Sequence, residues 1–434
     1  MKIKHIIFIK NINLSIIQWT KLRRCDIMKK TIISLFLFVL IFAFTVSGNS
    51  TYLSVAEEKE FSENPYGDIV AVDASVAVDA QLMTYAKSVV LMEKSTGKVL
   101  YSENENEKLF PASVTKIMTI LLVCEAIESG KMKLSDTVSC SANAASKGGS
   151  QIWLESGETM TVEELLKATC VYSANDACTL LGECVAGSEP AFNELMNTRA
   201  AELGMTNTHF DNCTGLDDTT DTHLTTAYDV ALMSRELLKH DFIKEYTTIW
   251  MDALRDGETQ LVNTNKLIRT YDGISGLKTG TTEKAGCCVS ATAKRNNMEL
   301  IAVVMGSENS NDRFTSAENL LDWGFANYEI YSPSVDSNSV GNIKVLFGKT
   351  DSVSVKIPSL SPILINKGAS ENISVDTEIT DSVTAPVEEN QIVGKIVVRN
   401  GENVLSEYDI TVSEPVKKLT FFDAFYKLLT SFSK

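Results

Sequence analysis

Apolar residues in the central part of the chain follow two different periods, which together predict a mixed fold. Two apolar runs separated by a Lys-Ser-Thr-Gly turn predict a hairpin over residues 86–101. A second hairpin is predicted from strand-like runs at 286–293 and 299–306, joined by a turn at 294–297. Helical patterns fall at residues 113–129, 161–170, 174–186, 189–203, 225–239 and 313–328. This order indicates an α+β domain over residues 86–331, with an antiparallel sheet flanked by helices.

The pattern changes after residue 331, where short alternating strands replace helices. Turn residues separate these strands at short intervals, which is typical of a small all-β sandwich, and we expect one over residues 332–413. The strand-like runs lie at 343–347, 353–357, 392–398 and 408–412. They carry no cluster of chemically reactive side chains, so we expect this domain to act as a spacer or to bind a partner.

The two ends of the chain have patterns of their own. Residues 414–434 place aromatic and aliphatic side chains on one half of a helical wheel and polar side chains, with lysines, on the other. This indicates an amphipathic helix that lies on a membrane surface through residues 415–434, although a helix docked on its own protein has the same pattern. A Pro-containing linker precedes the segment, which favours the membrane.

Near the other end, a basic Met-Lys-Lys start at residue 28 precedes an apolar run over 31–46 and small residues. This describes a secretory signal, so residues 1–48 are interpreted as an upstream extension plus a signal peptide. The alternative is an uncleaved membrane helix, because the run is just short of a span. Residues 49–85 are acidic and rich in Ala and Ser, and we expect a flexible leader of the mature, exported protein.

Charge and cysteine usage exclude some classes of partner. The whole chain has a formal net charge of −16, and residues 49–434 hold 32 basic and 55 acidic side chains, a net charge of −23. Such an acidic protein is a poor candidate for nucleic acid. Eight cysteines follow residue 48 without a CxxC pair or a nearby His, so no metal site is expected. Free, buried thiols are favoured over a disulfide framework.

One Ser-x-x-Lys pair stands out as candidate chemistry. Ser113 and Lys116 are three residues apart, so on a helix they share a face, as a nucleophile and its activating base must. The same spacing recurs at 95–98 and 431–434, but the first lies in a predicted turn and the second in the terminal helix. Only Ser113 follows a proline and opens a long apolar helical pattern. Taken alone, Ser113 would also suit a helix cap.

Two further signals lie downstream of this pair. Ser173 and Asn175 fall between two helical patterns, where a loop can present both side chains into a cleft. The sequence Lys278-Thr279-Gly280 occurs just before the second predicted hairpin. A lysine and a threonine on an edge strand can bind a carboxylate, while the glycine leaves room for a peptide. A glycine-rich entry into a strand is the plain alternative.

In this order, the three motifs are the triple of the penicillin-recognising serine enzymes. The chain resembles the serine-type D-alanyl-D-alanine carboxypeptidases, the low-molecular-mass penicillin-binding proteins, over nearly all of its length after the signal. The resemblance is carried by residues 110–119, 172–177, 215–217, 276–282 and 312–314. It implies a DD-peptidase/β-lactamase-like fold with a β-rich second domain and an amphipathic anchor.

The resemblance also implies roles for the motif residues. Ser113 would attack the D-Ala-D-Ala carbonyl, and Lys116, kept neutral by burial and by the charge of Lys278, would act as base. Ser173 would relay a proton to the leaving amine, and Asn175 would hold the substrate amide.

The substrate carboxylate would be bound by Lys278, Thr279 and Arg313, beside Gly280. Backbone N–H groups of Ser113 and Thr281 would form the oxyanion hole. No cofactor is implied. The implied partners are peptidoglycan stem peptides and, as inhibitors, β-lactam antibiotics, and the implied location is the outer face of the cytoplasmic membrane of a bacterium.

Two other functions share parts of this pattern. A class A β-lactamase has the same triple and a deacylating glutamate, and residues 189–193 match its Glu-Pro-x-x-Asn pattern. That match lies inside a helical pattern and close to Ser173, so we interpret it as coincidental. A non-catalytic wall-binding or β-lactam-sensing protein is the other alternative, and the intact motifs count against it.

Overall fold

A computed structural model describes residues 82–335 and 340–431 of the chain. The signal peptide and most of the acidic leader were predicted at residues that lie outside the described ones. The predicted domain limits likewise remain predictions.

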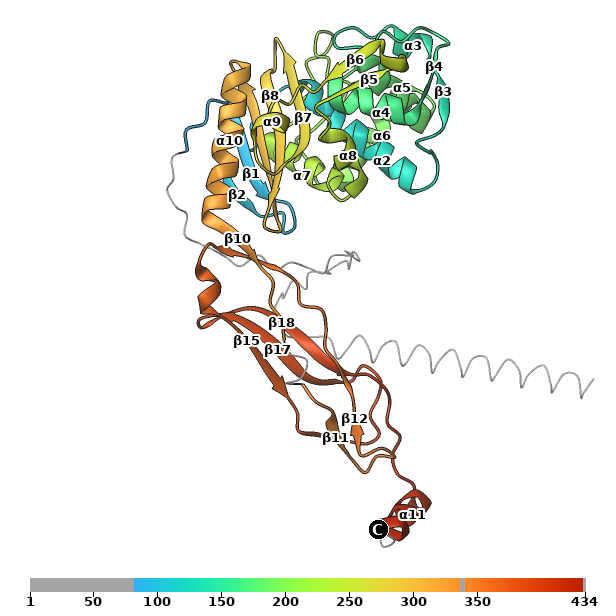
Figure 1. Ribbon diagram of the computed structural model, residues 1–434, viewed down its shortest axis with the longest axis vertical. Coiled ribbons are helices and arrows are strands. Elements are labelled where there is room, and N and C mark those ends of the chain that lie inside the picture. Colours follow the sequence, from blue (N-terminus) through green and yellow to red (C-terminus); the bar gives the residue numbers. More distant parts are fainter. Residues whose placement is uncertain (1–81, 336–339, 432–434) are drawn as a thin grey trace, which may run out of the picture. The chain divides into compact units, whose positions relative to one another are not determined.

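A five-stranded antiparallel sheet forms the centre of the first domain (Figure 1). Its strand order is β2-β1-β9-β8-β7, which leaves β7 at one edge. The strands are β1 (Ser88–Glu93), β2 (Val99–Glu103), β7 (Ile274–Thr282), β8 (Gly286–Arg295) and β9 (Met298–Ser307). Both predicted hairpins are therefore confirmed. Asn296 and Asn297 connect β8 to β9 with φ angles of 47° and 64°, the left-handed conformation that a tight hairpin turn requires.

Helices cover both faces of this sheet (Figure 1). On one face, α10 (Ser310–Asn327) packs with Val89 and Leu91 of β1 in one core cluster. On the other, Val90 and Met92 share a larger core with the remaining helices. Those helices are α2 (Lys116–Glu128), α4 (Val162–Lys167), α5 (Asn175–Ala186), α6 (Glu189–Glu202) and α7 (Ala227–Leu237). Successive strand residues point to opposite faces, so burial on both faces explains why β1 is a continuous apolar run.

The predicted helices differ from the observed ones mainly at their ends. The first begins as a 3-10 turn, η1 (Ala112–Thr115), and becomes α-helical only from Lys116. The second stops at Lys167 and continues as a π turn, η2 (Ala168–Tyr172). Short elements without a clear period were not predicted. They are β3 (Thr137–Ser139), α3 (Ala142–Ala145), β4 (Thr159–Thr161), β5 (Met251–Leu254), β6 (Thr259–Val262), α8 (Lys244–Thr247) and α9 (Leu267–Thr270).

The second domain is all-β, as predicted. A four-stranded sheet has the order β13-β18-β17-β15, and a three-stranded sheet has the order β12-β11-β16. A shared core of aliphatic side chains, including Ile343, Ile396 and Ile410, draws on both sheets. The strands are β11 (Ile343–Leu346), β12 (Ser352–Val353), β13 (Val355–Lys356), β15 (Ile373–Ile379), β16 (Ser382–Thr384), β17 (Ile392–Asn400) and β18 (Asn403–Val412).

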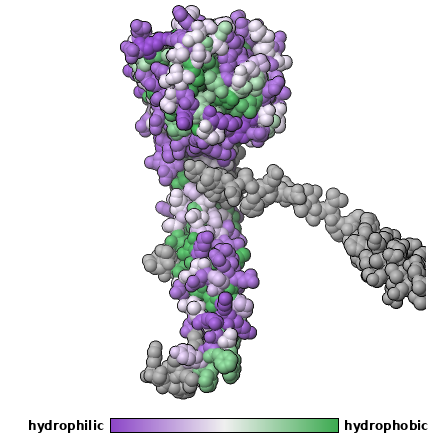
Figure 2. Space-filling model, turned by 90° about the vertical axis from the view of Figure 1, so that its right-hand side faces the viewer, coloured by the Kyte–Doolittle hydropathy of each residue, from purple (hydrophilic) through white to green (hydrophobic). Residues whose placement is uncertain are grey.

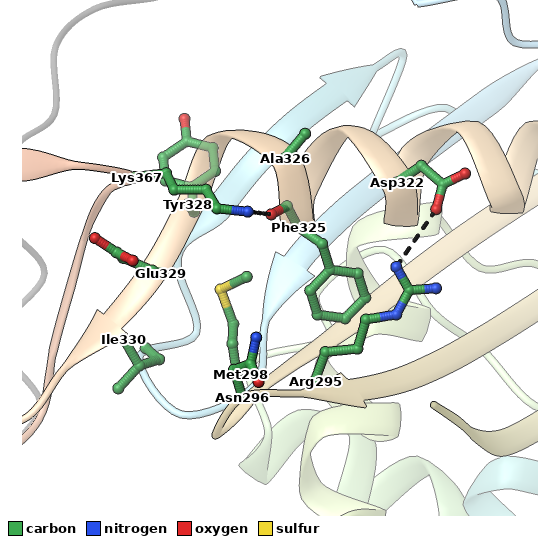
Figure 3. Close-up of a pocket in the computed structure, with 10 residues that line it drawn as sticks. All are labelled: Arg295, Asn296, Met298, Asp322, Phe325, Ala326, Tyr328, Glu329, Ile330 and Lys367. Carbon is green, nitrogen blue, oxygen red and sulfur yellow. Dashed lines mark hydrogen bonds and ion pairs between the residues drawn. The ribbon is translucent and has the colours of Figure 1, made fainter. Parts of the chain in front are cut away.

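A short strand connects α10 to this domain. It is β10 (Tyr328–Tyr331), which pairs with β14 (Ile363–Asn366). A cavity of about 460 Å³ lies beside it (Figure 3). Its cationic groups already have partners. The Lys367 ammonium donates to the Phe325 carbonyl at 3.0 Å, and the Arg295 guanidinium covers the Phe325 ring and pairs with Asp322. These contacts stabilise the end of α10 and engage both cationic groups of the cavity.

The chain's last described element is α11 (Phe421–Ser431). Phe421, Phe422, Phe425 and Tyr426 are all exposed on it, and Figure 2 shows apolar surface where α11 lies. No helix within residues 82–335 or 340–431 is both long and apolar enough to cross a membrane.

Candidate active site

Ser113 lies in the η1 turn, where two glycines allow other segments to approach it closely. A Cβ on Gly280 of β7 would lie 2.8 Å from both the Ser113 nitrogen and the Pro111 oxygen. A Cβ on Gly215 would lie 1.8 Å from the Ala112 oxygen. Neither position can therefore hold a larger residue without displacing the turn. The two glycines fix the place of Ser113 between β7 and the loop that contains Gly215.

Lys116 occupies the first position of α2 and is completely buried. Its ammonium donates to Ser113 Oγ at 2.9 Å, to Asn175 Oδ1 at 2.6 Å and to the Thr214 carbonyl at 2.8 Å. Burial lowers the pKa of Lys116 to about 8. The amine is thus close enough to accept the Ser113 proton, and a substantial fraction of it is neutral near pH 8.

Ser173 and Asn175 follow the π turn, and Asn175 contacts Lys116. Ser173 has a left-handed conformation, with φ of 66°. Its buried Oγ has no hydrogen-bond partner in the described part of the chain, so it is available to a ligand. Asn175 is held on two sides, because its Nδ2 donates to the Gly148 carbonyl at 2.7 Å while its Oδ1 accepts from Lys116.

Strand β7 brings the third motif to the same place. Lys278 is buried and donates to the Thr279 carbonyl at 3.0 Å, and the Thr279 hydroxyl donates to Thr264 Oγ1 at 2.6 Å. Burial, and then the positive charge of Lys116, lower the pKa of Lys278 well below its usual value. We expected the charge of Lys278 to lower the pKa of Lys116. In the structure the charge of Lys116 lowers the pKa of Lys278 instead.

Arg313 reaches β7 from the opposite face, out of α10. Its guanidinium donates to the Gly280 carbonyl and to Thr281 Oγ1, both at 2.9 Å. Its Nε is buried and has no partner among residues 82–335 and 340–431. Arg313 thus lies beside the residues with which it was predicted to act.

Three cations meet here without a counter-ion. Lys116, Lys278 and Arg313 are each at most 6% exposed, and none forms an ion pair with any residue that the structure describes. Buried cations are costly unless they are paired. Arg313 keeps its charge, and a bound anion would favour the protonated form of the neighbouring lysines, so this site, with unpaired polar atoms on Ser173 and Arg313, suits an anionic ligand.

Several contributors to the site were not predicted from the sequence. The Thr214 carbonyl is one, since any residue type can supply a backbone acceptor. His223 is another: its Nδ1 accepts from the Asp211 N–H at 3.0 Å, so its Nε2 carries the proton and donates to Thr115 Oγ1 at 2.8 Å. Burial lowers the pKa of His223 to about 4, so it holds the η1 turn as a neutral ring.

Cysteines surround the two lysines. Cys170, Cys178 and Cys213 are buried, and the Cys178 thiol donates to the Cys213 carbonyl at 3.2 Å. All eight cysteines of the described residues are free, in agreement with the favoured interpretation. Within that part of the chain, no three His, Cys, Asp or Glu side chains lie close enough together to hold a metal ion.

Glu189, the glutamate of the lactamase-like pattern, has other partners. It begins α6, where its carboxylate accepts from Lys147 Nζ at 2.5 Å and from Asn143 Nδ2 at 2.9 Å. It makes no hydrogen bond to Ser113 or Lys116. This arrangement agrees with a structural role at the start of the helix.

Comparison with known proteins adds independent information. The profile of the D-alanyl-D-alanine carboxypeptidase family matches residues 74–309, and that of the penicillin-binding protein 5 C-terminal domain matches residues 328–418. The D-alanyl-D-alanine carboxypeptidase DacF of Bacillus subtilis is 41% identical over 359 residues, which cover 82% of this chain and 92% of the relative.

Solved structures give the same picture. Penicillin-binding protein 5 of Haemophilus influenzae matches with a TM-score of 0.64 and 27% identity, covering 78% of this chain and 99% of that one. Penicillin-binding protein D2 of Listeria monocytogenes, solved in a cefotaxime-bound form, matches with a TM-score of 0.52 and 29% identity, covering 57% and 99% of the two chains.

Proposed function

The chain belongs to the D-alanyl-D-alanine carboxypeptidase family, and we propose that it removes the last D-Ala from peptidoglycan stem peptides through an acyl-enzyme on Ser113. The 2.9 Å contact between Lys116 Nζ and Ser113 Oγ carries this proposal. The lowered pKa of Lys116 supports it, because only the neutral amine can accept a proton.

In the proposed reaction, Lys116 takes the Ser113 proton as Oγ bonds to the carbonyl carbon of the penultimate D-Ala. The C–N bond to the last D-Ala then breaks, and the leaving amine receives a proton through Ser173, whose Oγ has no partner among the described residues. Water attacks the resulting ester, which frees Ser113 and the shortened peptide.

The substrate is proposed to lie along β7, whose outer edge is unpaired in the sheet. Lys278, Thr279 and Arg313 would bind its terminal carboxylate, in keeping with two basic groups that lack a counter-ion among the described residues and with the hydroxyl of Thr279. Gly280 brings β7 against the Ser113 nitrogen, which supports an oxyanion hole formed by the N–H groups of Ser113 and Thr281.

A fluorescent penicillin tests the nucleophile. The wild type is expected to be labelled, and the cefotaxime-bound form of the Listeria relative supports binding of this drug class. Ser113→Ala should lose the label. Ser95→Ala is a matched control, since it alters another Ser-x-x-Lys pair, and it should keep the label. Labelling that persists in Ser113→Ala would contradict the proposal.

Product analysis separates the alternatives. A pentapeptide ending in D-Ala-D-Ala should release free D-Ala, and the penicilloyl-enzyme should turn over slowly. Rapid, repeated hydrolysis of penicillin without D-Ala release would instead indicate a β-lactamase. Labelling without D-Ala release from any muropeptide would indicate a β-lactam-binding wall protein.

We further propose that the enzyme is exported and held on the outer face of the cytoplasmic membrane of a bacterial cell by residues 415–434. The exposed aromatic side chains of α11 support this. Deleting residues 415–434 should move the protein to the soluble fraction with its activity intact. A truncated protein that stays on membranes would point to an uncleaved N-terminal helix.

A further inference from the structure

Trp153 is an outlier in both conformation and exposure. Its φ is 59°, in the left-handed region that a bulky side chain rarely adopts, and 75% of it is exposed. A strained backbone and an exposed indole both oppose folding, so the surrounding structure must impose them. Such local strain suggests a role in binding.

Two side chains, Asp176 and Arg255, impose this conformation. The buried Asp176 carboxylate accepts from the Ile152 N–H at 3.1 Å and from the Leu154 N–H at 3.0 Å, on either side of Trp153. The Arg255 guanidinium donates to the Ile152 carbonyl at 2.8 Å. The backbone is therefore fixed while the indole points out to solvent.

The same loop is attached to the active site. Asp176 directly follows Asn175, whose N–H donates to the Ser150 carbonyl at 2.6 Å and whose Nδ2 donates to the Gly148 carbonyl. By bond lengths along the Leu154–Asp176 contact, the Trp153 Cα lies within about 13 Å of the Asn175 Cα. Trp153 is thus held close to the residue proposed to bind the substrate amide.

We propose that Trp153 is a specificity-determining contact, whose indole face binds a primary amine on the side chain of the residue that precedes D-Ala-D-Ala. This inference rests on the proposed function. A cation over an indole face is attracted by the ring's negative potential. Glu155 is exposed two residues further along the chain, so its Cα lies within about 7.6 Å of the Trp153 Cα.

The charge of the surroundings favours an amine over an apolar group. The Glu155 carboxylate forms no ion pair with the part of the chain that the structure describes. The neighbouring residues Gln151 and Ser156 are polar, so the indole is not part of an exposed apolar cluster along this segment. A free carboxylate beside an indole attracts a cation and disfavours an apolar partner.

Two matched substrates test the inference on the full chain. Nα-acetyl-Lys-D-Ala-D-Ala keeps the side-chain amine, and the diacetyl form lacks its charge. Trp153→Ala should lower kcat/KM for the first by about 2- to 30-fold and for the second by less than about 2-fold. Trp153→Phe, which keeps a ring, should lose less.

Two controls separate binding from folding. Trp153→Gly removes the indole but suits a positive φ, so it should lose the same preference for the amine without lowering the melting temperature. Phe347→Ala removes another exposed aromatic residue at positive φ (57°, 67% exposed) from the second domain, and both substrates should be unaffected.

The outcomes that overturn the inference differ from those that overturn the proposed function. Equal losses on both substrates would mean that Trp153 contacts a part that both share, such as the peptide backbone or the aliphatic stem of the lysine, and unchanged kinetics would mean that it contacts neither. Either result overturns amine recognition. Failure of the wild type to release D-Ala from both peptides would contradict the proposed function itself.

Discussion

Two lysines of the first domain and one of the second lie in opposite environments. In the first domain, Lys116 and Lys278 are buried and unpaired by any described carboxylate. In the second, Lys395 is 40% exposed at its side chain and lies 3.3 Å from Glu407 and 3.7 Å from Glu378. An exposed pair like this contributes little and costs little, whereas an unpaired buried cation is costly. The contrast supports the proposal that the buried lysines take part in the reaction.

The largest effect is expected from replacing the buried Lys116. Lys116→Met removes the proposed base but fills most of the same space, so acylation by a penicillin should fall by about 10³-fold. The substitution also removes the cost of burying a charge. Breaking a buried ion pair lowers the free energy of unfolding by roughly 3–5 kcal/mol, and we expect no loss of that size here. Stopped-flow acylation and urea denaturation measure the two effects. Acylation within about tenfold of the wild type would exclude Lys116 as the base.

A substitution at Gly280 tests how closely β7 must approach the η1 turn. Gly280→Ala places a Cβ 2.8 Å from the Ser113 nitrogen, so β7 and the η1 turn must separate. We expect kcat/KM to fall by about 10²-fold and stability to fall by about 1–3 kcal/mol. Gly341→Ala is the matched control, because no atom lies within 4 Å of its Cβ position, and it should be neutral. Similar activity of both variants would contradict this account of Gly280.

The pH dependence of acylation tests the environment of Lys116. Because its pKa is about 8, the rate should rise about tenfold per pH unit below pH 8 and level off above it. Folded Lys116 binds fewer protons than the unfolded chain between this pKa and 10.5, so stability should rise with pH in that window.

A carboxylate placed next to Lys116 should raise the pKa of Lys116 again. Asn175→Asp would place a carboxylate where Asn175 Oδ1 now lies, 2.6 Å from Lys116 Nζ. The positive form of Lys116 would be stabilised, and the midpoint of the pH profile should move upward. A midpoint that stays in place would show that a group other than Lys116 sets it.

The smallest effect is expected at the surface pair. Lys395→Met should change the free energy of unfolding by less than about 0.5 kcal/mol and leave acylation unchanged, because both partners are solvated. Thermal denaturation and penicillin labelling measure these quantities. A loss of acylation as large as that expected for Lys116→Met would remove the contrast between the buried and the exposed lysines.

The sequence allowed much of the fold to be predicted, for reasons visible in particular residues. Long periodic elements such as α5 and β8 were found because packing on the core requires their apolar spacing. The strands β5 and β6 have four residues each, too few for a period to appear. The π turn before Ser173 was not predicted because no local pattern specifies a π turn.

The candidate site likewise contains some groups that the sequence predicts and others that only the structure reveals. The side chains of Ser113, Lys116 and Asn175 have recognisable spacing, and the structure brings them together. The carbonyls of Thr214, Gly148 and Ser150 have no residue-type signature, so only the folded chain reveals them. The left-handed conformation of Trp153 could not be predicted from the sequence either, because it arises from contacts with Asp176.

The pairing of β1 with β9 has a consequence for how the enzyme is made. Ser88 lies opposite Met305, so the centre of the sheet joins segments more than 200 residues apart. Pairings of such long range are slow to form, because the loop between them must close first. The contact between the η1 turn and Gly280 is likewise of long range in the sequence. A chain that is still emerging should therefore be inactive until residues beyond Ser307 are available, and catalytic activity reports that the whole domain has folded.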